Sequence, residues 1–528
     1  MIGHSVPEYI FIRICITGLR LIAPLSILYL IACLYTNTWI LSPWIAAYAF
    51  VEAAFYLLVY LPRSWYLQKA AVHPPRLSEE ERKALFSRCF ARVRDTDQAA
   101  GWFFASPPHE IFRDNIAEWL LWALFSSDRN GREEWEDEIE QYIQAMEKLM
   151  GHKFKTGWNE SVGCMKVSMD PVVSLHRPFI WYLIISIVDT YTTILLACNG
   201  FIPYLQHDWH FHFPPHVLAH WARKAPTDRL SYWYRPHRSK TKHPILLLHG
   251  IGIGLWTYVP FLLEIVKEDP EVGIIAIENL PISMRMSPPP LDRFAMLDAI
   301  TKILDYHELP NVVVASHSYG TITAAHMFKD AKLQKRIAAS LFIDPITFLL
   351  HLPSVAFNFL YREPKTANEW QLWYFASRDP DIARCLSRHF FWIENVLWKE
   401  ELKDRRVGVV LSGRDQIVDS IEVWRYLTGE ADKDPEFRWA TDNLEILYYP
   451  DLDHSKVFDT AEQRRPLVEM IGRFVETKST SNGKVEDTSG GDDMHGSSTI
   501  SERRQANETT SLIGSTSSAI SYRSNLKN

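Results

Sequence analysis

The chain has 528 residues, more than one hydrophobic core usually holds, so we expect at least two folding units. Its formal net charge of −7 provides no basic surface for nucleic acid, so we expect no nucleic-acid partner. The six cysteines are widely scattered without a Cys-x-x-Cys pair, which indicates neither a disulfide framework nor a zinc site.

Residues 1–72 are the most apolar part of the chain and predict a helical hairpin embedded in a membrane. Its second apolar run, residues 40–61, would be roughly 33 Å long as a helix, enough to cross the hydrocarbon. Glu52 lies within this run and needs a partner or a proton. Lys and Arg flank the hairpin but not its connecting loop, which predicts that both flanks, and with them the domain that follows, are cytoplasmic. We expect the membrane to be an endomembrane, such as that of the endoplasmic reticulum or a lipid droplet. The alternative is a helical pair buried in the protein.

Residues 73–229 predict a mixed helical region. Ser78 opens one helix with a sequence typical of a capping box, and residues 114–125 form an amphipathic pattern with an aromatic face. A further helix is predicted from residue 132 to 150, with charges on its outer side.

The apolar segment 179–198 lies within this region and has Asp189 near its middle. It could cross the bilayer, but a central aspartate is costly there, so we favour a helix that lies on the membrane or packs against the domain that follows.

Five histidines follow that segment: His207, His210, His212, His216 and His220. The spacing of His216 and His220 would suit a metal pair on one helix face. No third ligand has a convincing spacing, so we expect solvated or hydrogen-bonded histidines and no metal.

From residue 230 to 476 the pattern changes to alternating strands and helices, which predicts a mostly parallel sheet with helices on both faces. The aromatic-rich interval 346–404 interrupts this alternation and predicts a helical cap. Residues 477–528 are polar and charged, and we expect a disordered tail there. The expected strands are Ser231–Arg235, Pro244–His249, Gly273–Glu278, Asn311–Ser316, Ala338–Ile343, Val407–Leu411 and Leu444–Tyr449.

A short β-branched run, residues 312–315, is followed at once by Ser316-His317-Ser318-Tyr319-Gly320 and then by a helical pattern. Strand, tight turn and helix are the context of a nucleophile elbow, which would expose the hydroxyl of Ser318 above the sheet. The usual motif begins with glycine, and Ser316 stands in its place. A buried strand that ends in a serine-rich turn is the alternative.

Two later strand ends supply the partners that a serine nucleophile needs. Asp415 follows the strand 407–411, and His454 follows the strand 444–449. The order serine, acid, histidine is the one found on this type of sheet. Because the carboxyl ends of parallel strands meet at one edge, we expect Ser318, Asp415 and His454 to converge.

A glycine-rich loop follows the apolar strand at residues 245–248, and its glycines let backbone N–H groups approach a substrate. We expect the amides of Ile251 and Tyr319 to form an oxyanion hole. A dinucleotide-binding loop is the rival interpretation, but its G-x-G-x-x-G spacing is missing. The glycines concerned are Gly250, Gly252 and Gly254.

The His249-Gly250 loop, the elbow at Ser318, the acid loop around Asp415 and the terminal His454 together resemble the α/β-hydrolase superfamily, in particular its His-Gly-x serine hydrolases. The membrane hairpin looks like that of fungal membrane-associated members. The resemblance implies hydrolysis of an ester, thioester or amide through an acyl-enzyme, without a cofactor. It also leaves Asp344 open as the acid, since some members use that position; Asp419 and Asp453 are weaker candidates.

These observations predict a membrane-anchored serine hydrolase that acts on a lipophilic acyl ester. Two alternatives remain open: acyl transfer to an acceptor other than water, and a non-catalytic membrane scaffold that kept the fold.

Overall fold

The computed structural model describes residues 2–93, 96–207 and 211–477. His210 and, from residue 478 on, the predicted disordered tail lie outside the described residues.

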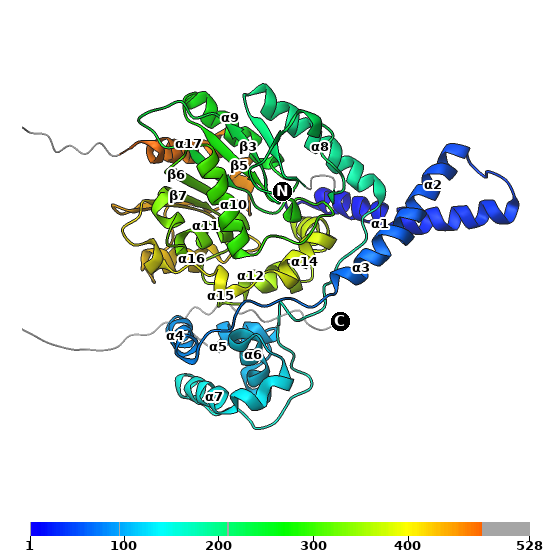
Figure 1. Cartoon of the computed structure of the whole chain (residues 1–528). Coiled ribbons are helices and arrows are strands. Elements are labelled where there is room, and N and C mark those ends of the chain that lie inside the picture. Colours follow the sequence, from blue (N-terminus) through cyan, green and yellow to red (C-terminus); the bar gives the residue numbers. More distant parts are fainter. Residues whose placement is uncertain (1, 94–95, 208–210, 478–528) are drawn as a thin grey trace, which may run out of the picture. The chain divides into compact units, whose positions relative to one another are not determined.

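The strands of the described residues form one sheet of ten, in the order β2-β1-β3-β5-β4-β6-β7-β8-β10-β9 (Figure 1). The six strands from β5 to β10 in this order pair in parallel, and β3 and β9 pair antiparallel at either side of them. The strands are β1 (Ile202–Leu205), β2 (Arg223–Lys224), β3 (Ser231–Arg235), β4 (Ile245–Leu248), β5 (Ile274–Glu278), β6 (Val312–His317), β7 (Ile337–Ile343), β8 (Val407–Ser412), β9 (Arg438–Ala440) and β10 (Leu444–Tyr449).

Helices cover both faces of the parallel strands, as buried, continuously apolar strands require. Side chains of α9 (Val259–Glu268) and α17 (Ala461–Val475) pack in the core on one face. Those of α10 (Arg293–Tyr306), α11 (Gly320–Lys329) and α16 (Ser420–Thr428) pack in the core on the other. The predicted α/β fold is therefore confirmed.

The seven expected strands are all present, with ends that differ by one residue at most. The sequence pattern missed β1, β2 and β9, which have only four, two and three residues. Strands this short carry no readable alternation. Since β1 and β2 precede residue 230, the sheet reaches into the region for which only helices were expected.

The interval predicted as a cap consists of short helices joined by turns and irregular segments, without a strand among its described residues. It packs on the helical region that precedes the sheet, where the indole N–H of Trp392 donates to the carbonyl of Ala123 at 3.1 Å. Ser78 forms the predicted capping box. The cap helices are α12 (Ser354–Ala356), α13 (Ala367–Leu372), α14 (Pro380–Arg388) and α15 (Trp392–Asn395); the earlier region holds α4 (Glu79–Phe90), α5 (Thr96–Ala100), α6 (Arg113–Phe125) and α7 (Glu136–Met150).

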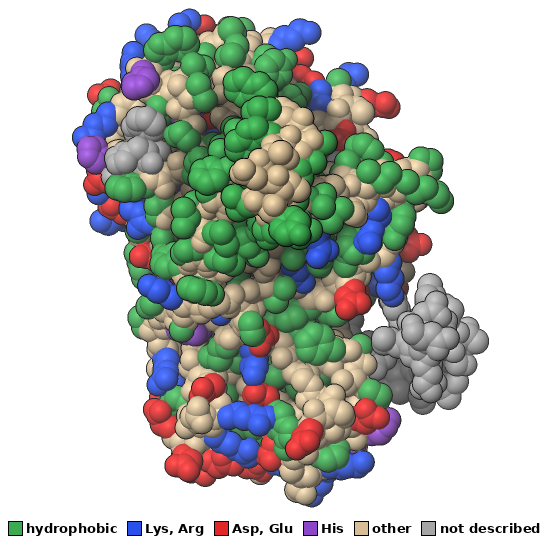
Figure 2. Space-filling model, turned by 90° about the vertical axis from the view of Figure 1, so that its right-hand side faces the viewer, with side chains coloured by type: hydrophobic (Ala, Val, Ile, Leu, Met, Phe, Trp, Pro, Cys, Tyr) green, Lys and Arg blue, Asp and Glu red, His purple; other side chains and the backbone are tan. Residues whose placement is uncertain are grey.

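The N-terminal segment forms a helical hairpin of α1 (Val6–Thr36) and α2 (Pro43–Phe55), which continues into α3 (Leu61–Leu67). Three helices are long and apolar enough to cross a membrane: α1, the continuous helix from α2 to α3, and α8 (Phe179–Cys198). Many of their large apolar side chains are exposed. Figure 2 shows hydrophobic side chains gathered where the hairpin projects and charged ones gathered below it.

Polar residues inside these apolar helices have partners elsewhere in the chain. The buried carboxylate of Glu52 accepts a hydrogen bond from the backbone N–H of Phe179 at 2.9 Å. Asp189 of α8 forms an ion pair with Arg285 at 2.6 Å. The pairing of Asp189 joins α8 to the segment between β5 and α10, which carries Arg285.

A partly buried ion pair joins α3 to the cap. The guanidinium of Arg63 donates through Nε to Asp381 at 3.0 Å and through Nη2 to the carbonyl of Ser287 at 2.8 Å. The carboxylate of Asp381 is 7% exposed and also accepts the N–H of Ser287 at 3.1 Å.

We expect Asp381→Ala to lower the free energy of unfolding by about 1.5–3 kcal/mol, because it removes the charge-assisted hydrogen bonds that Arg63, whose side chain is 21% exposed, makes to the buried carboxylate. Denaturant unfolding in detergent measures this loss. Glu79→Ala is the matched control, since Glu79 pairs with Lys83 on the surface and such pairs contribute about 0–1 kcal/mol. Equal losses in the two variants would contradict the role assigned to Asp381.

Candidate active site

Ser318 lies in the tight turn between β6 and α11, with a φ of +49°. A left-handed φ is uncommon for serine and is typical of a strained elbow. Gly320 is required here, because a Cβ at that position would lie 2.2 Å from the carbonyl oxygen of Leu248. Ser316, which stands where the motif usually has glycine, is fully buried with its hydroxyl 3.4 Å from the carbonyl of Leu341.

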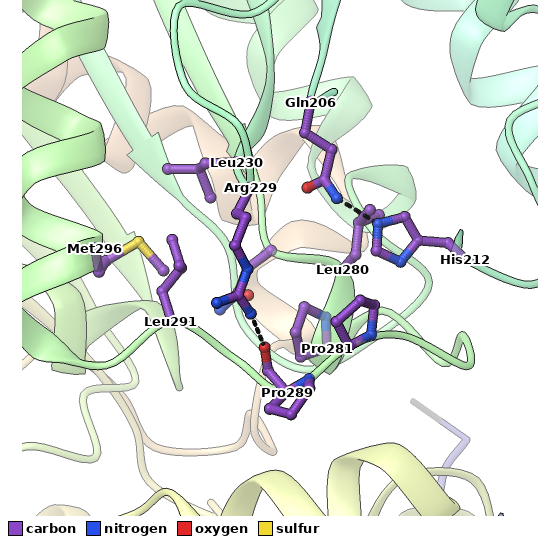
Figure 3. A pocket seen from close by; sticks show the side chains of 11 residues that line it. Gln206, His212, Arg229, Leu230, Leu280, Pro281, Pro289, Leu291 and Met296 are labelled. Carbon is purple, nitrogen blue, oxygen red and sulfur yellow. Dashed lines mark hydrogen bonds between the residues drawn. The ribbon is translucent and has the colours of Figure 1, made fainter. Parts of the chain in front are cut away.

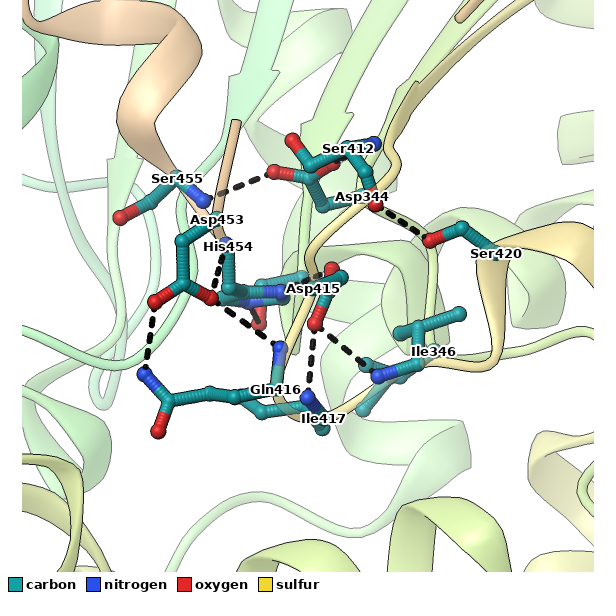
Figure 4. Close-up of polar contacts among 12 residues, drawn as sticks. Asp344, Ile346, Ser412, Asp415, Gln416, Ile417, Ser420, Asp453, His454 and Ser455 are labelled. Carbon is teal, nitrogen blue, oxygen red and sulfur yellow. Dashed lines mark hydrogen bonds and ion pairs between the residues drawn. The ribbon is translucent and has the colours of Figure 1, made fainter. Parts of the chain in front are cut away.

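The structure brings the three predicted side chains together in one hydrogen-bonded line. The Oγ of Ser318 lies 2.8 Å from Nε2 of His454, and Nδ1 of His454 lies 2.6 Å from Oδ2 of Asp415. The other carboxylate oxygen of Asp415 accepts the N–H groups of Ile417 at 2.7 Å and Val418 at 3.0 Å (Figure 4). These amides fix the carboxylate, and the carboxylate fixes the ring.

The electrostatic environment favours the protonated ring of His454. Burial alone would lower the pKa of His454. The charge of Asp415 and its hydrogen bond to the ring have the larger effect and raise the pKa to about 9. The Asp415 carboxylate thus stabilises an imidazolium that forms between it and Ser318.

Asp344, the alternative acid, occupies a different position. Its carboxylate accepts the backbone N–H of Ser412 at 3.0 Å and that of Ser455 at 2.8 Å (Figure 4). Burial, together with the nearby charge of Asp415, raises the pKa of Asp344 to about 7. Among the described residues, the carboxylate that hydrogen-bonds the ring of His454 is that of Asp415. Asp344 instead connects the end of β8 to the loop that follows β10.

The two weaker acid candidates bind backbone groups. Asp453 accepts the N–H groups of His454 at 2.7 Å and of Gln416 at 3.1 Å, so it shapes the loop that carries the histidine. Asp419 caps α16, where it accepts the N–H of Glu422 at 3.1 Å.

The glycine-rich loop after β4 is held by side chains that face inward. Nε2 of His249 accepts the N–H of Asn279 at 2.9 Å, which places its proton on Nδ1, 2.7 Å from the carbonyl of Gly250. The N–H of Gly250 donates to the hydroxyl of Tyr258 at 2.8 Å, and the N–H of Gly252 donates to the carbonyl of Ile282.

The predicted oxyanion donors, Ile251 and Tyr319, flank Ser318. Both line an apolar pocket beside the Ser318 side chain. Within the described residues, neither backbone N–H donates to a protein acceptor. The amides on either side of Ile251 are both occupied by the bonds described above. These two N–H groups are therefore available to an incoming oxygen.

Sequence reasoning missed Tyr258 and His317. The hydroxyl of Tyr258 donates to Nδ1 of His317 at 2.6 Å while it accepts the N–H of Gly250, so it connects the glycine-rich loop to the elbow. Burial lowers the pKa of His317 well below its usual range, which leaves the ring neutral and able to accept. The two residues lie 59 positions apart in the sequence, so no local motif reveals the pair.

Two cavities meet at Ser318. The larger measures about 560 Å³ and is lined by His454, His317 and residues of α8, α13 and the glycine-rich loop. The smaller measures about 40 Å³ and is lined by apolar side chains of the cap and the elbow.

A third small pocket, of about 30 Å³, shares no lining residue with these cavities (Figure 3). Its polar groups are bonded to one another: Gln206 lies within hydrogen-bond distance of His212, and Arg229 donates to the carbonyl of Pro289 at 2.7 Å. This pocket indicates no ligand.

The predicted histidine pair does not share a helix face, because His220 lies in the 3₁₀ turn Ala219–Trp221 and His216 precedes it. The two nitrogens of His216 face different carboxylates, Asp189 at 3.0 Å and Glu278 at 3.5 Å. Atoms of these three residues lie close enough to hold a metal ion. Arg285 already pairs with Asp189, so the arrangement is that of a buried ion-pair network.

A model of the alpha/beta hydrolase family matches residues 245–469. No curated protein matches the chain.

Similar solved structures include a membrane phospholipase A described as a bacterial virulence factor, with 11% identity over 56% of this chain and 93% of that one and a TM-score of 0.37. An esterase from Pyrococcus furiosus has 14% identity over 47% of this chain and 88% of its own, with a TM-score of 0.32. A carboxylesterase from Bacillus subtilis has 10% identity over 55% of this chain and 98% of its own, with a TM-score of 0.36.

The specific resemblance to fungal membrane-associated members stays a prediction. The matched segment begins at β4 and ends in α17, and it contains all six parallel strands. This segment, residues 245–469, therefore resembles the alpha/beta hydrolase family in sequence and has its fold.

Proposed function

We propose that the chain is a membrane-anchored serine hydrolase that cleaves a lipophilic carboxylic ester through an acyl-enzyme. The observation that carries the proposal is the hydrogen-bonded line from Ser318 through His454 to Asp415. A serine hydroxyl needs a base to take its proton, and the base needs an acid to orient it and to stabilise its charge.

In the first half-reaction, Nε2 of His454 takes the proton of Ser318 as the serine oxygen attacks the ester carbonyl carbon. The tetrahedral adduct expels the alcohol, which leaves with that proton, and the acyl group stays on Ser318. In the second half-reaction, His454 deprotonates a water molecule that attacks the acyl carbon. The carboxylic acid leaves, and the proton returns to the serine oxygen.

The backbone N–H groups of Ile251 and Tyr319 bind the negative oxygen of each tetrahedral adduct. One such donor lowers the barrier by about 2.7–4 kcal/mol. The bonds of Tyr258 and His249 to the glycine-rich loop support this role, because they fix the loop before substrate arrives.

Membrane anchoring is supported by the three helices that are long and apolar enough to cross a bilayer. The large cavity at Ser318 is lined by Tyr191 and Leu195 of α8, one of those helices. A lipophilic ester that is dissolved in the membrane would therefore meet the cavity beside an apolar surface.

The direct test is labelling by a fluorophosphonate probe, which reacts with an activated serine. We expect the wild-type protein to be labelled and Ser318→Ala not to be, with kcat for a naphthyl ester falling by about 10⁶. Ser316→Ala, two residues away, is the matched control and should remain labelled. A wild-type protein that stays unlabelled and hydrolyses no ester would contradict the proposed function and favour a non-catalytic membrane scaffold.

The assignment of the acid is tested by two matched substitutions. We expect Asp415→Asn to lower kcat by about 10⁴, because the amide lacks the negative charge and can place an N–H donor against Nδ1, which favours the wrong tautomer of His454. Asp344→Asn should lower kcat less, since Asp344 binds two backbone amides and not the ring. Steady-state kinetics on both variants decides the matter, and the reverse ranking would make Asp344 the acid.

The pH profile follows from the charge on His454. Only the neutral ring can accept the serine proton, and Asp415 raises the pKa of His454 to about 9. We expect kcat/KM to rise with pH as the imidazolium loses its proton, with the midpoint above 6.5. The residual activity of Asp415→Asn should have its midpoint at lower pH, because the stabilising charge is gone. A profile that falls over this range would contradict the role of His454 as base.

A further inference from the structure

The two cavities at Ser318 differ in chemistry as well as in size. The side chains that line the small one are almost entirely apolar, and they come from the elbow, the acid loop, the cap and the helical region before the sheet. Phe359, Ile251 and Ile417 line both cavities, so these three side chains lie on the boundary between them.

The position of His454 decides which half of an ester enters which cavity. His454 lines the large cavity, whereas Tyr319, one of the two oxyanion donors, lines the small one. The alcohol oxygen must receive its proton from His454, so the alcohol half lies in the large cavity. The acyl chain leaves the carbonyl carbon on the opposite side and enters the small cavity.

The small cavity limits the length of the acyl chain. About 10–15 Å³ of such volume holds one water-sized group, so about 40 Å³ holds three or four. An acetyl to butyryl group fits, and a longer chain meets the wall. Leu386 of α14 and Val167 of the helical region, both buried in hydrophobic clusters, form part of that wall together with Phe390.

The large cavity has room for a bulky alcohol. Its volume of about 560 Å³ lies within the range of pockets that bind drug-sized molecules. Leu372, Phe375 and Leu195 give it an apolar lining. Two other side chains of α8, Ile187 and Ile194, are exposed on the same helix, so the apolar lining is continuous with an apolar surface.

We propose that the substrate is a short-chain acyl ester of a bulky lipophilic alcohol, with two to four acyl carbons. The lipophilic half is thus the alcohol and not the acid. This inference rests on the proposed function and adds the substrate class to it.

The first experiment compares esters of one alcohol, 2-naphthol, with acetate, butyrate, octanoate and palmitate as the acyl half, in the same detergent micelles. We expect kcat/KM to fall at least about tenfold between butyrate and octanoate, because each methylene beyond the wall must displace packed side chains. A constant or rising kcat/KM would overturn the inference.

Two substitutions then enlarge the small cavity. Leu386→Ala and Phe390→Ala should each raise the ratio of kcat/KM for octanoate to that for acetate by about tenfold. Phe390 is only partly buried, so its variant tests the wall even where Leu386→Ala fails to fold. Phe294→Ala, at an exposed position on α10, is the matched control and should leave the ratio unchanged. An unchanged ratio in Phe390→Ala would contradict the assignment of the wall.

The alcohol half is tested with the acetates of ethanol, decanol and cholesterol. We expect kcat/KM to be at least about tenfold higher for the acetate of the largest alcohol that is accepted than for ethyl acetate. Trp256→Ala should reduce this difference, since Trp256 lines the large cavity. Preference for long acyl chains, with intact fluorophosphonate labelling of Ser318, would overturn this inference alone. Absence of both labelling and hydrolysis would overturn the proposed function with it.

Discussion

The carboxyl edge of the parallel sheet is the constraint on which the site depends. Strands β6, β7, β8 and β10 lie side by side in parallel, so the loops that follow them meet at one edge. Ser318 leaves β6, Asp415 leaves β8 and His454 leaves β10, and each loop needs only a few residues to reach the others. Residues up to 136 positions apart thereby come within 2.8 Å.

Asp344 explains how this edge holds its geometry. It directly follows β7, the strand between those that carry Ser318 and Asp415, and it accepts one N–H from the last residue of β8 and one from the loop after β10. A buried carboxyl is costly unless such bonds compensate it. Its raised pKa indicates that burial and the charge of Asp415 oppose its ionisation, whereas Asp415 is stabilised by two amides and the His454 ring. Two neighbouring acids thus have different roles because their partners differ.

The sequence was sufficient for the parts of this arrangement that depend on local pattern. Runs of a few residues are enough to predict the buried strands, the elbow glycine Gly320 and the order of Ser318, Asp415 and His454. The parallel topology then predicts that the three side chains meet at one edge of the sheet. The contacts of Tyr258 with His317, and of Val167 with the small cavity, depend on packing between segments far apart in sequence. No periodicity reports such contacts. The short strands β1, β2 and β9 were missed because their residues pair only where the neighbouring strand already exists.

The N-terminal half of the chain does more than carry apolar helices. Three polar side chains of those helices bond groups from other segments: Glu52 the amide of Phe179, Arg63 the carboxylate of Asp381, and Asp189 the guanidinium of Arg285. Apolar contacts alone have little directional preference, so a helix could rotate about its axis at small cost. A single buried hydrogen bond or ion pair removes that freedom, because a rotated helix would leave its polar group buried with neither a protein partner nor water. These three links therefore fix how α2, α3 and α8 face the domain, and with α8 they fix the apolar wall of the large cavity.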